Sequence, residues 1–365
     1  MLKPITQPFC CGALNACLEL QMHLLRWLCD PTTAAADVTQ INLAPPRVPT
    51  QIEADWLWRF LNGRKQTRLE QATVIAGMSA ADKTALLGWS NSVVAVAAQF
   101  LPAPTAWPIT PPVISAPAWT AFKGLMEAFY ERGLKSVLPY RADGTPVAVG
   151  GVTYANFVQA FRDAHRQNPE PNAREVCVLC GGPLGQTAEV DHWIAKSAYP
   201  VLSVCADNLL PICGECNSTA NKGEKDVHSS GSFADWFHPY LHPVNGTVTL
   251  GYVLPDLIVT CTSTLPADQP KVDNLNRLIN LADRWTREFK AEYINQLDVL
   301  RGRERRRVQR AQARHTLAEI LAYVQQWQDD LLPSEPHHEV HQVLCVAMQK
   351  PERLAALHSE LNLVT

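Results

Sequence analysis

The chain has 365 residues, of which 47% are hydrophobic and 18% are charged. This composition excludes a disordered, collagen-like or low-complexity protein, and the length is sufficient for two or three domains. The 32 lysines and arginines are balanced by 35 aspartates and glutamates, giving a formal net charge of −3. No positive field of the whole molecule would therefore attract nucleic acid, and such contact would need a local basic patch.

The N-terminal hundred residues have the pattern of helices. Apolar residues from Leu14 to Leu28 recur at three- and four-residue steps, which is typical of an amphipathic helix, and helical character returns over 56–61 and 80–100. We therefore expect a helical N-terminal domain over 1–101. No apolar run is long enough to span a membrane, and polar residues interrupt the stretch after Cys10, so we expect a cytoplasmic protein with no membrane partner.

Prolines mark the end of this region. Six of the sixteen residues from Pro102 to Pro117 are proline, which removes backbone donors and restricts φ. This pattern predicts a Pro-rich linker over 102–118. The alternative is a rigid surface loop inside one larger domain.

A mixed segment follows the linker. Helices are expected over 121–132 and 154–166, whereas Gly and Pro break the apolar runs between 176 and 223 into short pieces. Such pieces suit a β-hairpin and a loop that lead into a short helix. We assign the central domain to 119–245.

The last third of the chain returns to helices after a strand-like stretch over 247–259. One apolar stripe at helical spacing runs through Leu275, Leu278, Ala282, Trp285, Phe289, Tyr293, Leu297 and Leu300. A stripe of this kind is typical of core packing. We expect a helical C-terminal domain over 246–365, and the fold class is mainly α with a small α+β core.

The spacing of the cysteines points to a metal. Of eleven cysteines, four form two CxxC pairs separated by 32 residues, namely Cys177, Cys180, Cys213 and Cys216. Four thiolates on two tight turns suit tetrahedral Zn²⁺, and such a closed site is structural. The odd total argues against a disulfide framework. The alternative is four buried thiols without metal.

The residues between and after these pairs resemble a known family. The matching positions are Asp191-His192, Asn208-Leu209, Cys216-Asn217 and Lys222-Gly223. In this arrangement the segment resembles the HNH nucleases, also called the ββα-metal or His-Me finger family, in the subset clamped by a four-cysteine zinc site. The resemblance covers 177–223 only. It implies a central zinc-clamped ββα-metal finger flanked by helical domains.

Chemistry assigns roles to two of these residues. A neutral imidazole can accept a proton from water at neutral pH, so His192 suits a general base. Adjacent side chains of an extended strand point to opposite faces, so Asp191 can serve a different partner. The resemblance implies that Asp191 binds one catalytic Mg²⁺ or Mn²⁺ and that Asn208 braces the loop that orients His192. The alternative for His192 is a buried structural histidine or a further zinc ligand.

Three further positions carry predictions. Asn217 is the expected second ligand of the catalytic cation, but the interval from it to Lys222 is two residues longer than usual in the family. Asn221, one helical turn beyond Asn217, is the other candidate. Lys222 is expected to contact a phosphate, unless it is an ordinary solvated lysine.

An arginine run near the C-terminus is the local basic patch. Seven arginines and one glutamate over fourteen residues, 301–314, give a net charge of +6. Their spacing can line one helix face and follow a phosphate backbone. We expect nucleic-acid contacts from Arg303, Arg306, Arg307 and Arg310. The alternative is a solvated helix face paired to acids elsewhere.

These observations predict a metal-dependent endonuclease with structural Zn²⁺ and catalytic Mg²⁺ or Mn²⁺. DNA is the expected substrate, with RNA cleavage as an alternative. The resemblance further suggests a bacterial restriction or antiviral defence context, with a regulatory protein or a second copy binding the helical flanks. A second alternative is an inactive, zinc-stabilised nucleic-acid-binding or scaffold subunit.

Overall fold

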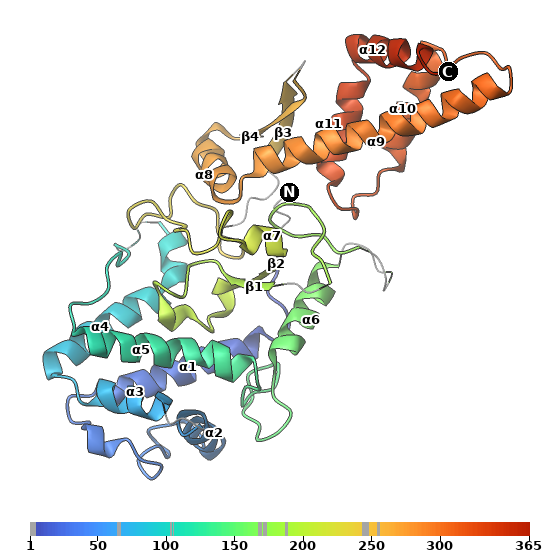
Figure 1. Cartoon of the computed structure of the whole chain (residues 1–365). Helices are drawn as coiled ribbons and strands as arrows, with labels where there is room; N and C mark the ends of the chain where they lie inside the picture. The colour runs from blue at the N-terminus through green and yellow to red at the C-terminus, as the bar shows by residue number, and fades with distance from the viewer. Residues whose placement is uncertain are drawn as a thin grey trace.

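The computed structural model describes residues 5–63, 67–102, 104, 106–166, 170, 174–186, 189–242, 248–253 and 256–365. The described chain is mainly helical, with two small antiparallel sheets of two strands each. The expected fold class, mainly α with a small α+β core, is confirmed in this coarse form. Figure 1 shows a rounded body built from the first two thirds of the chain and a long arm built from the last third.

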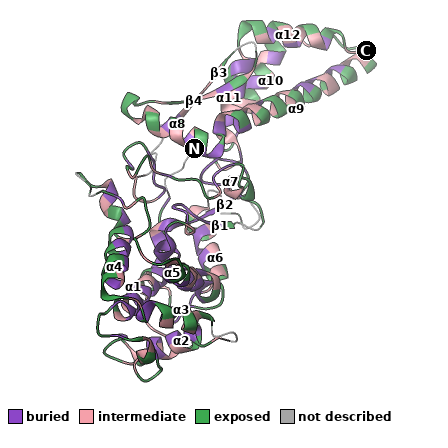
Figure 2. Cartoon of the chain, turned by 60° about the vertical axis from the view of Figure 1, so that its left-hand side comes forward, coloured by how far each residue is buried: buried purple, intermediate pink, exposed green. Residues whose placement is uncertain are grey.

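The N-terminal part of the body contains α1 (Cys11–Leu28), α2 (Gln51–Leu61), α3 (Thr67–Ala76) and α4 (Ala80–Val94). The first turns of α2 and α4 are capped by Thr50 and Ser79, whose hydroxyls accept the backbone N–H groups of Glu53 and Asp82. Such caps satisfy donors that have no partner inside the helix. These helices turn their apolar faces inward, as the purple ribbon in Figure 2 shows.

Helix α5 (Ala116–Ala128) joins this part to the centre. It begins inside the predicted linker, because Ser115 caps its first turn and Pro117 occupies a position where no backbone donor is needed. It packs on α3 and on the short turn Pro200–Leu202, and it continues as one π-helical segment, Phe129–Leu134. The domain boundaries at 101 and 118 stay predictions.

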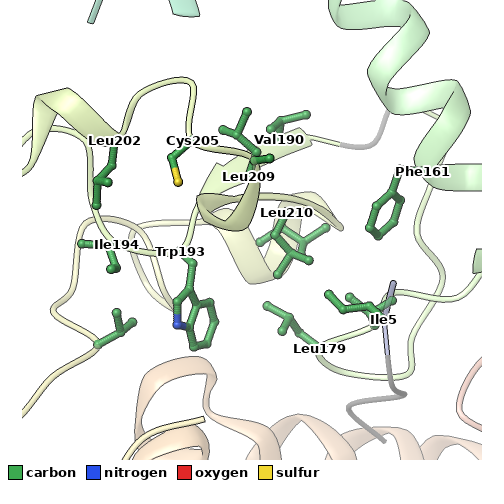
Figure 3. Close-up of a cluster of buried hydrophobic side chains, with 14 of the residues drawn as sticks. Ile5, Phe161, Leu179, Val190, Trp193, Ile194, Leu202, Cys205, Leu209 and Leu210 are labelled. Carbon is green, nitrogen blue, oxygen red and sulfur yellow. The ribbon is translucent and has the colours of Figure 1, made fainter. Parts of the chain in front are cut away.

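The centre is built around a small hairpin. Strand β1 (Glu189–His192) pairs antiparallel with β2 (Leu209–Ile212), so that His192 lies opposite Leu209 and Glu189 opposite Ile212. Helix α6 (Tyr154–His165) precedes the hairpin and the four-residue helix α7 (Gly214–Asn217) follows it. Figure 3 shows the apolar cluster around the hairpin, to which Phe161 of α6 and the loop residues Leu179, Trp193 and Leu202 contribute.

In the described part of the chain, the arm consists of a hairpin and five α-helices. Its elements are β3 (Val248–Val253), β4 (Ile258–Ser263), α8 (Gln269–Ile279), α9 (Leu281–Gln309), α10 (Leu317–Asp330), α11 (His338–Met348) and α12 (Pro351–Asn362). Strands β3 and β4 pair antiparallel, and β4 packs on α8 and α9. Helices α11 and α12 pack on α9, and α10 packs on α11 and α12 (Figure 1). The predicted domain boundary between 245 and 246 lies outside the described residues.

The apolar stripe predicted over 275–300 is not carried by one helix. Asn280 adopts a left-handed conformation, with φ of 52°, and separates α8 from α9. Asparagine tolerates this conformation better than most residues. The side chain of Asn276 accepts the N–H of Ala282 at 2.8 Å and fixes the junction. The stripe therefore turns a corner, and both halves are buried.

Two adjacent glycines close a loop of the body between the π-helical segment and α6. The N–H of Leu138 donates to the carbonyl of Val152 at 2.8 Å, and the N–H of Val152 donates to Tyr140 at 2.9 Å. A Cβ on Gly151 would lie 1.8 Å from the Leu138 oxygen, whereas a Cβ on Gly150 would meet nothing within 4 Å. Gly150 is needed only for its φ of +80°.

We predict different stabilities for the two alanine variants. Gly151→Ala should lower the free energy of unfolding by about 3 kcal/mol, because the new methyl group forces the paired backbone apart. Gly150→Ala should cost about 1 kcal/mol, which is the penalty of a left-handed alanine. Urea denaturation followed by circular dichroism measures both. Equal losses in the two variants would contradict the close approach at Gly151.

Candidate active site and zinc centre

The four cysteines of the two CxxC pairs meet in one buried cluster. All four Sγ atoms lie within 4.8 Å of one another. The Sγ atoms of Cys177 and Cys216 are 4.0 Å apart, and those of Cys180 and Cys213 are 3.8 Å apart. Tetrahedral Zn²⁺ with Zn–S bonds of about 2.3 Å places its sulfurs about 3.8 Å apart. The cluster therefore fits a structural zinc, as the sequence predicts.

Tight turns hold both pairs. The N–H of Cys177 donates to the carbonyl of Gly182 at 2.7 Å, and Gly181 takes a φ of +73° that closes the first turn. In the second turn, Cys213 caps α7 and its Sγ accepts the N–H of Cys216 at 3.5 Å. Backbone N–H groups directed at sulfur stabilise thiolates, so the turns are suited to a metal in electrostatic terms as well.

Helix α9 of the arm contacts the cluster directly. The guanidinium of Arg284 donates to the Cys216 Sγ at 3.2 Å and to the Glu215 carboxylate at 3.0 Å. The indole of Trp285 donates to the Cys180 carbonyl at 2.9 Å. A cation beside four thiolates offsets part of the negative charge that remains when Zn²⁺ is bound. Sequence reasoning missed Arg284, because nothing in its pattern separates it from a solvated arginine.

The last residue of β1, His192, is buried and neutral. Its Nε2 lies 2.9 Å from the Ser203 carbonyl, which can only accept a hydrogen bond, so Nε2 carries the proton. Burial lowers the pKa of His192 to about 3, and Lys196 acts in the same direction. The Nδ1 atom is therefore an unprotonated acceptor at neutral pH, and no hydrogen bond joins it to a described residue.

The rim around His192 carries charge. Tyr130 of the π-helical segment packs edge-on against the imidazole, with ring centroids 4.6 Å apart. The ammonium of Lys196 lies 4.6 Å from the Tyr130 ring centroid and also pairs with Glu131. Glu131 bonds Lys135 at 2.7 Å as well. One carboxylate thus holds two lysines beside the tyrosine that covers the imidazole.

Asn208 fixes the loop between the two strands. Its Oδ1 accepts the N–H of Ile194 at 2.7 Å, and its Nδ2 donates to the carbonyls of Ile194 and Leu202 at 2.9 and 3.4 Å. The N–H of Trp193 donates to the Asn208 carbonyl at 2.9 Å. These bonds tie the residues that follow His192 to the turn that leads to Ser203, the partner of its Nε2.

Asp191 points to the other face of β1 and meets a buried lysine. The Lys222 ammonium lies 2.9 Å from one carboxylate oxygen of Asp191 and 3.1 Å from the other. It also donates to the His192 carbonyl at 2.8 Å, and its side chain has no solvent exposure. Burial raises the pKa of Asp191 to about 6, against the opposing effect of Lys222. Asp191 and Lys222 form a buried ion pair, and Lys222 does not reach the surface where a phosphate would lie.

The expected ligands of a catalytic cation do not converge. Besides the Asp191 ion pair, the Asn217 amide donates to Glu189 at 2.6 Å and the Asn221 amide donates to the Glu215 carbonyl at 2.7 Å. Mg²⁺ requires near-octahedral oxygen ligands at about 2.0 to 2.1 Å. An ammonium already neutralises the carboxylate, so these residues as arranged do not fit a Mg²⁺ or Mn²⁺ site. Sequence reasoning missed Glu189 as a partner, although it lies two residues before Asp191 on the same strand.

The predicted arginine patch lies far from His192. Arg303 is nineteen residues beyond Arg284 on α9, about 29 Å along the helix axis. Its guanidinium stacks on Tyr323 at 4.4 Å, and Arg307 pairs with Glu319 at 2.6 Å. Arg306 and Arg310 are exposed. Part of the run therefore pairs within the arm, as the alternative interpretation expected.

Comparisons with known proteins leave the family open. No family model matches the chain. No solved structure matches it. The chain is similar to the protein ea31 of Escherichia phage lambda, with 30% identity over 108 residues that cover 27% of this chain and 35% of ea31. The chain thus spans about a third of the length of that relative, whose name states no activity. Within the described residues, no helix is long and apolar enough to cross a membrane.

We predict that purified protein holds about one Zn²⁺ per chain and that Cys213→Ser abolishes this. The variant should also lose the protection of the 177–216 segment against proteolysis, because the two turns are no longer joined. Elemental analysis measures the metal. The control is Cys261→Ser in β4, which removes a thiol outside the cluster. Equal zinc in both variants would contradict the site.

Proposed function

We propose that this protein is an endonuclease of the HNH type that hydrolyses phosphodiester bonds, with DNA as the substrate. The observation that carries the proposal is the state of His192. Its Nε2 donates to the Ser203 carbonyl, which leaves the unprotonated Nδ1 without a hydrogen bond to a described residue. Hydrolysis needs a positioned base for water, and a neutral imidazole held in one tautomer is suited to that step.

The order of elements around His192 supports the same proposal. Strand β1 ends in Asp191-His192 and is followed by the antiparallel strand β2 and the short helix α7. The four cysteines of the cluster lie before β1 and after β2, so that they bring the two ends of this unit together. Asn208 holds the loop that carries Ser203, so it acts as a positioning residue. Such support keeps the imidazole from rotating when a substrate approaches.

Charges near His192 favour an anionic substrate. Lys196 and Lys135 lie beside Tyr130, the residue that covers the imidazole, and both are shared with one carboxylate, Glu131. A phosphate could replace Glu131 as the partner of either ammonium. Local positive groups at this position would compensate for the net charge of −3 over the whole chain.

A second candidate function is a zinc-stabilised nucleic-acid-binding subunit without catalytic activity. One observation favours it: Lys222 already neutralises Asp191, the residue that the resemblance assigns to catalytic Mg²⁺ or Mn²⁺.

We propose that Lys222 competes with a divalent cation for this carboxylate. Nuclease activity would then require the Lys222 ammonium to leave the Asp191 carboxylate.

We predict that the purified chain nicks supercoiled plasmid in the presence of Mg²⁺ or Mn²⁺. His192→Ala should lower the rate at least 100-fold, which is the usual contribution of a general base. Agarose electrophoresis measures nicking, with structured RNA in a parallel reaction to test RNA cleavage. The control is His358→Ala in α12, which should leave the rate unchanged. Zinc-loaded wild-type protein that cuts neither substrate would overturn the proposal in favour of the second candidate.

We also predict that Lys222→Met increases the affinity for Mn²⁺ at least tenfold, because the buried Asp191 carboxylate loses its competing ammonium. Electron paramagnetic resonance of free Mn²⁺ measures this without reference to activity. The control is Lys225→Met, which removes a nearby ammonium bonded only to carbonyl groups. Zinc content and circular dichroism report whether each variant folds. Identical Mn²⁺ affinities of the two variants would show that Lys222 does not compete.

A further inference from the structure

A hollow of about 440 Å³ lies on the body, away from the zinc cluster. Three of its lining residues are arginines from different segments: Arg59 from α2, Arg68 from α3 and Arg132 from the π-helical segment. The sequence does not reveal this group, because the three residues are spread over 74 positions. It is distinct from the arginine run of α9.

None of these three guanidinium groups has an acidic partner among the described residues. The nearest acid in sequence to Arg132, Glu131, is bound to Lys135 and Lys196. Arg68 instead donates to the Phe60 carbonyl, and its guanidinium lies 5.0 Å from the Phe60 ring centroid. Burial lowers the pKa of Arg68, and the charge of Arg132 lowers it further. Three positive groups thus line one space, and no described carboxylate is paired with any of them, which is a favourable environment for an anion.

The remaining walls of the hollow are flat and mostly apolar. Trp56 and Phe60 stack with ring centroids 5.1 Å apart, and the Trp56 indole donates to the Val137 carbonyl at 3.0 Å. Residues 147–151 also line the hollow. Guanidinium groups beside aromatic and aliphatic residues suit a phosphate ester that carries an aromatic base, as in nucleotides.

One short segment connects the hollow with the candidate active site. In the π-helical segment Phe129–Leu134, Tyr130 packs against His192 and Arg132 lines the hollow. Phe129 in the same segment packs on Phe60, with ring centroids 4.6 Å apart. Arg132 is thus two residues along the chain from the tyrosine that packs against the imidazole.

We propose that Arg59, Arg68 and Arg132 bind the phosphate backbone of the nucleic-acid strand whose cleavage is assigned to His192. The hollow then holds a nucleotide unit a short distance from the scissile bond, and it fixes the direction of the strand. This inference rests on the proposed function for the identity of the strand. The recognition chemistry itself rests on three guanidinium groups that have no acidic partner among the described residues.

The test uses the full chain without divalent metal, so that no cleavage occurs. Fluorescence anisotropy measures binding of a labelled twelve-nucleotide single strand over a series of salt concentrations. The variant is Arg59→Gln/Arg132→Gln, both exposed residues whose loss should not affect folding. The control, Arg26→Gln/Arg141→Gln, removes the same charge from exposed arginines outside the hollow.

We expect the hollow variant to bind at least tenfold more weakly than the control variant at low salt. The slope of log K against log salt should fall by about 1.4, because each phosphate contact with a single strand contributes about 0.7. Equal affinities and slopes for the two variants would overturn the proposal. A second result would also overturn the proposal. If adenosine monophosphate binds to the hollow but the hollow variant still binds the strand as tightly as the control variant does, the hollow binds a free nucleotide and not the strand.

The experiments distinguish an error in the strand-binding proposal from an error in the proposed nuclease function. If the chain nicks DNA with dependence on His192 but the hollow variant binds the strand normally, only the present proposal is wrong. If the chain is inert but strand binding depends on Arg59 and Arg132, the hollow serves the inactive binding subunit described above. The arginine site then stands while the nuclease assignment falls.

Discussion

The convergence of four sulfur atoms is the constraint on which the rest of this structure depends. The two strands at the centre have only four residues each, and within the described residues they pair only with one another. A single two-stranded hairpin is marginally stable in water. Joining Cys177 and Cys180 to Cys213 and Cys216 encloses this hairpin between two tight turns. The apolar cluster of Figure 3 then packs against a unit whose ends are fixed. The position of His192 follows from that closure.

Side chains alternate between the two faces of a β-strand, so the adjacent residues Asp191 and His192 of β1 have different surroundings. His192 faces Tyr130 and keeps one unprotonated ring nitrogen, whereas Asp191 faces Lys222 and is neutralised internally. A buried ion pair of this kind is costly to break from one side, because the remaining charge is left unpaired. The carboxylate side of the strand is thus stable as it stands. On the imidazole side, the Nδ1 atom of His192 has no hydrogen bond to a described residue, and the neighbouring rim carries the charges of Lys196 and Glu131.

Sequence spacing was sufficient to predict the cysteine cluster and the helical character of most of the chain. Local patterns carry that information, because CxxC pairs form their own turns and apolar periodicity reports the buried face of a helix. Lys222 could not be placed in this way. The chain after Cys216 turns back so that the Lys222 N–H reaches the Cys216 carbonyl at 3.2 Å, and Gly223 takes a φ of +45°. This turn buries a lysine that would be solvated on a regular helix. The break at Asn280 was missed for a similar reason, since periodicity continues across a corner when both helices bury their apolar faces.

The arm is hydrogen-bonded to the turns that carry the two CxxC pairs, and this has a mechanical consequence. The N–H of His337, which precedes α11, donates to the Gly181 carbonyl at 2.7 Å, and Trp285 of α9 holds the Cys180 carbonyl. Helix α9 has 29 residues and is about 43 Å long. One part of this long helix is thus hydrogen-bonded to the backbone around the cysteines, while α12 packs on another part of it. A displacement of α9 relative to the body would act on the two CxxC turns through these hydrogen bonds.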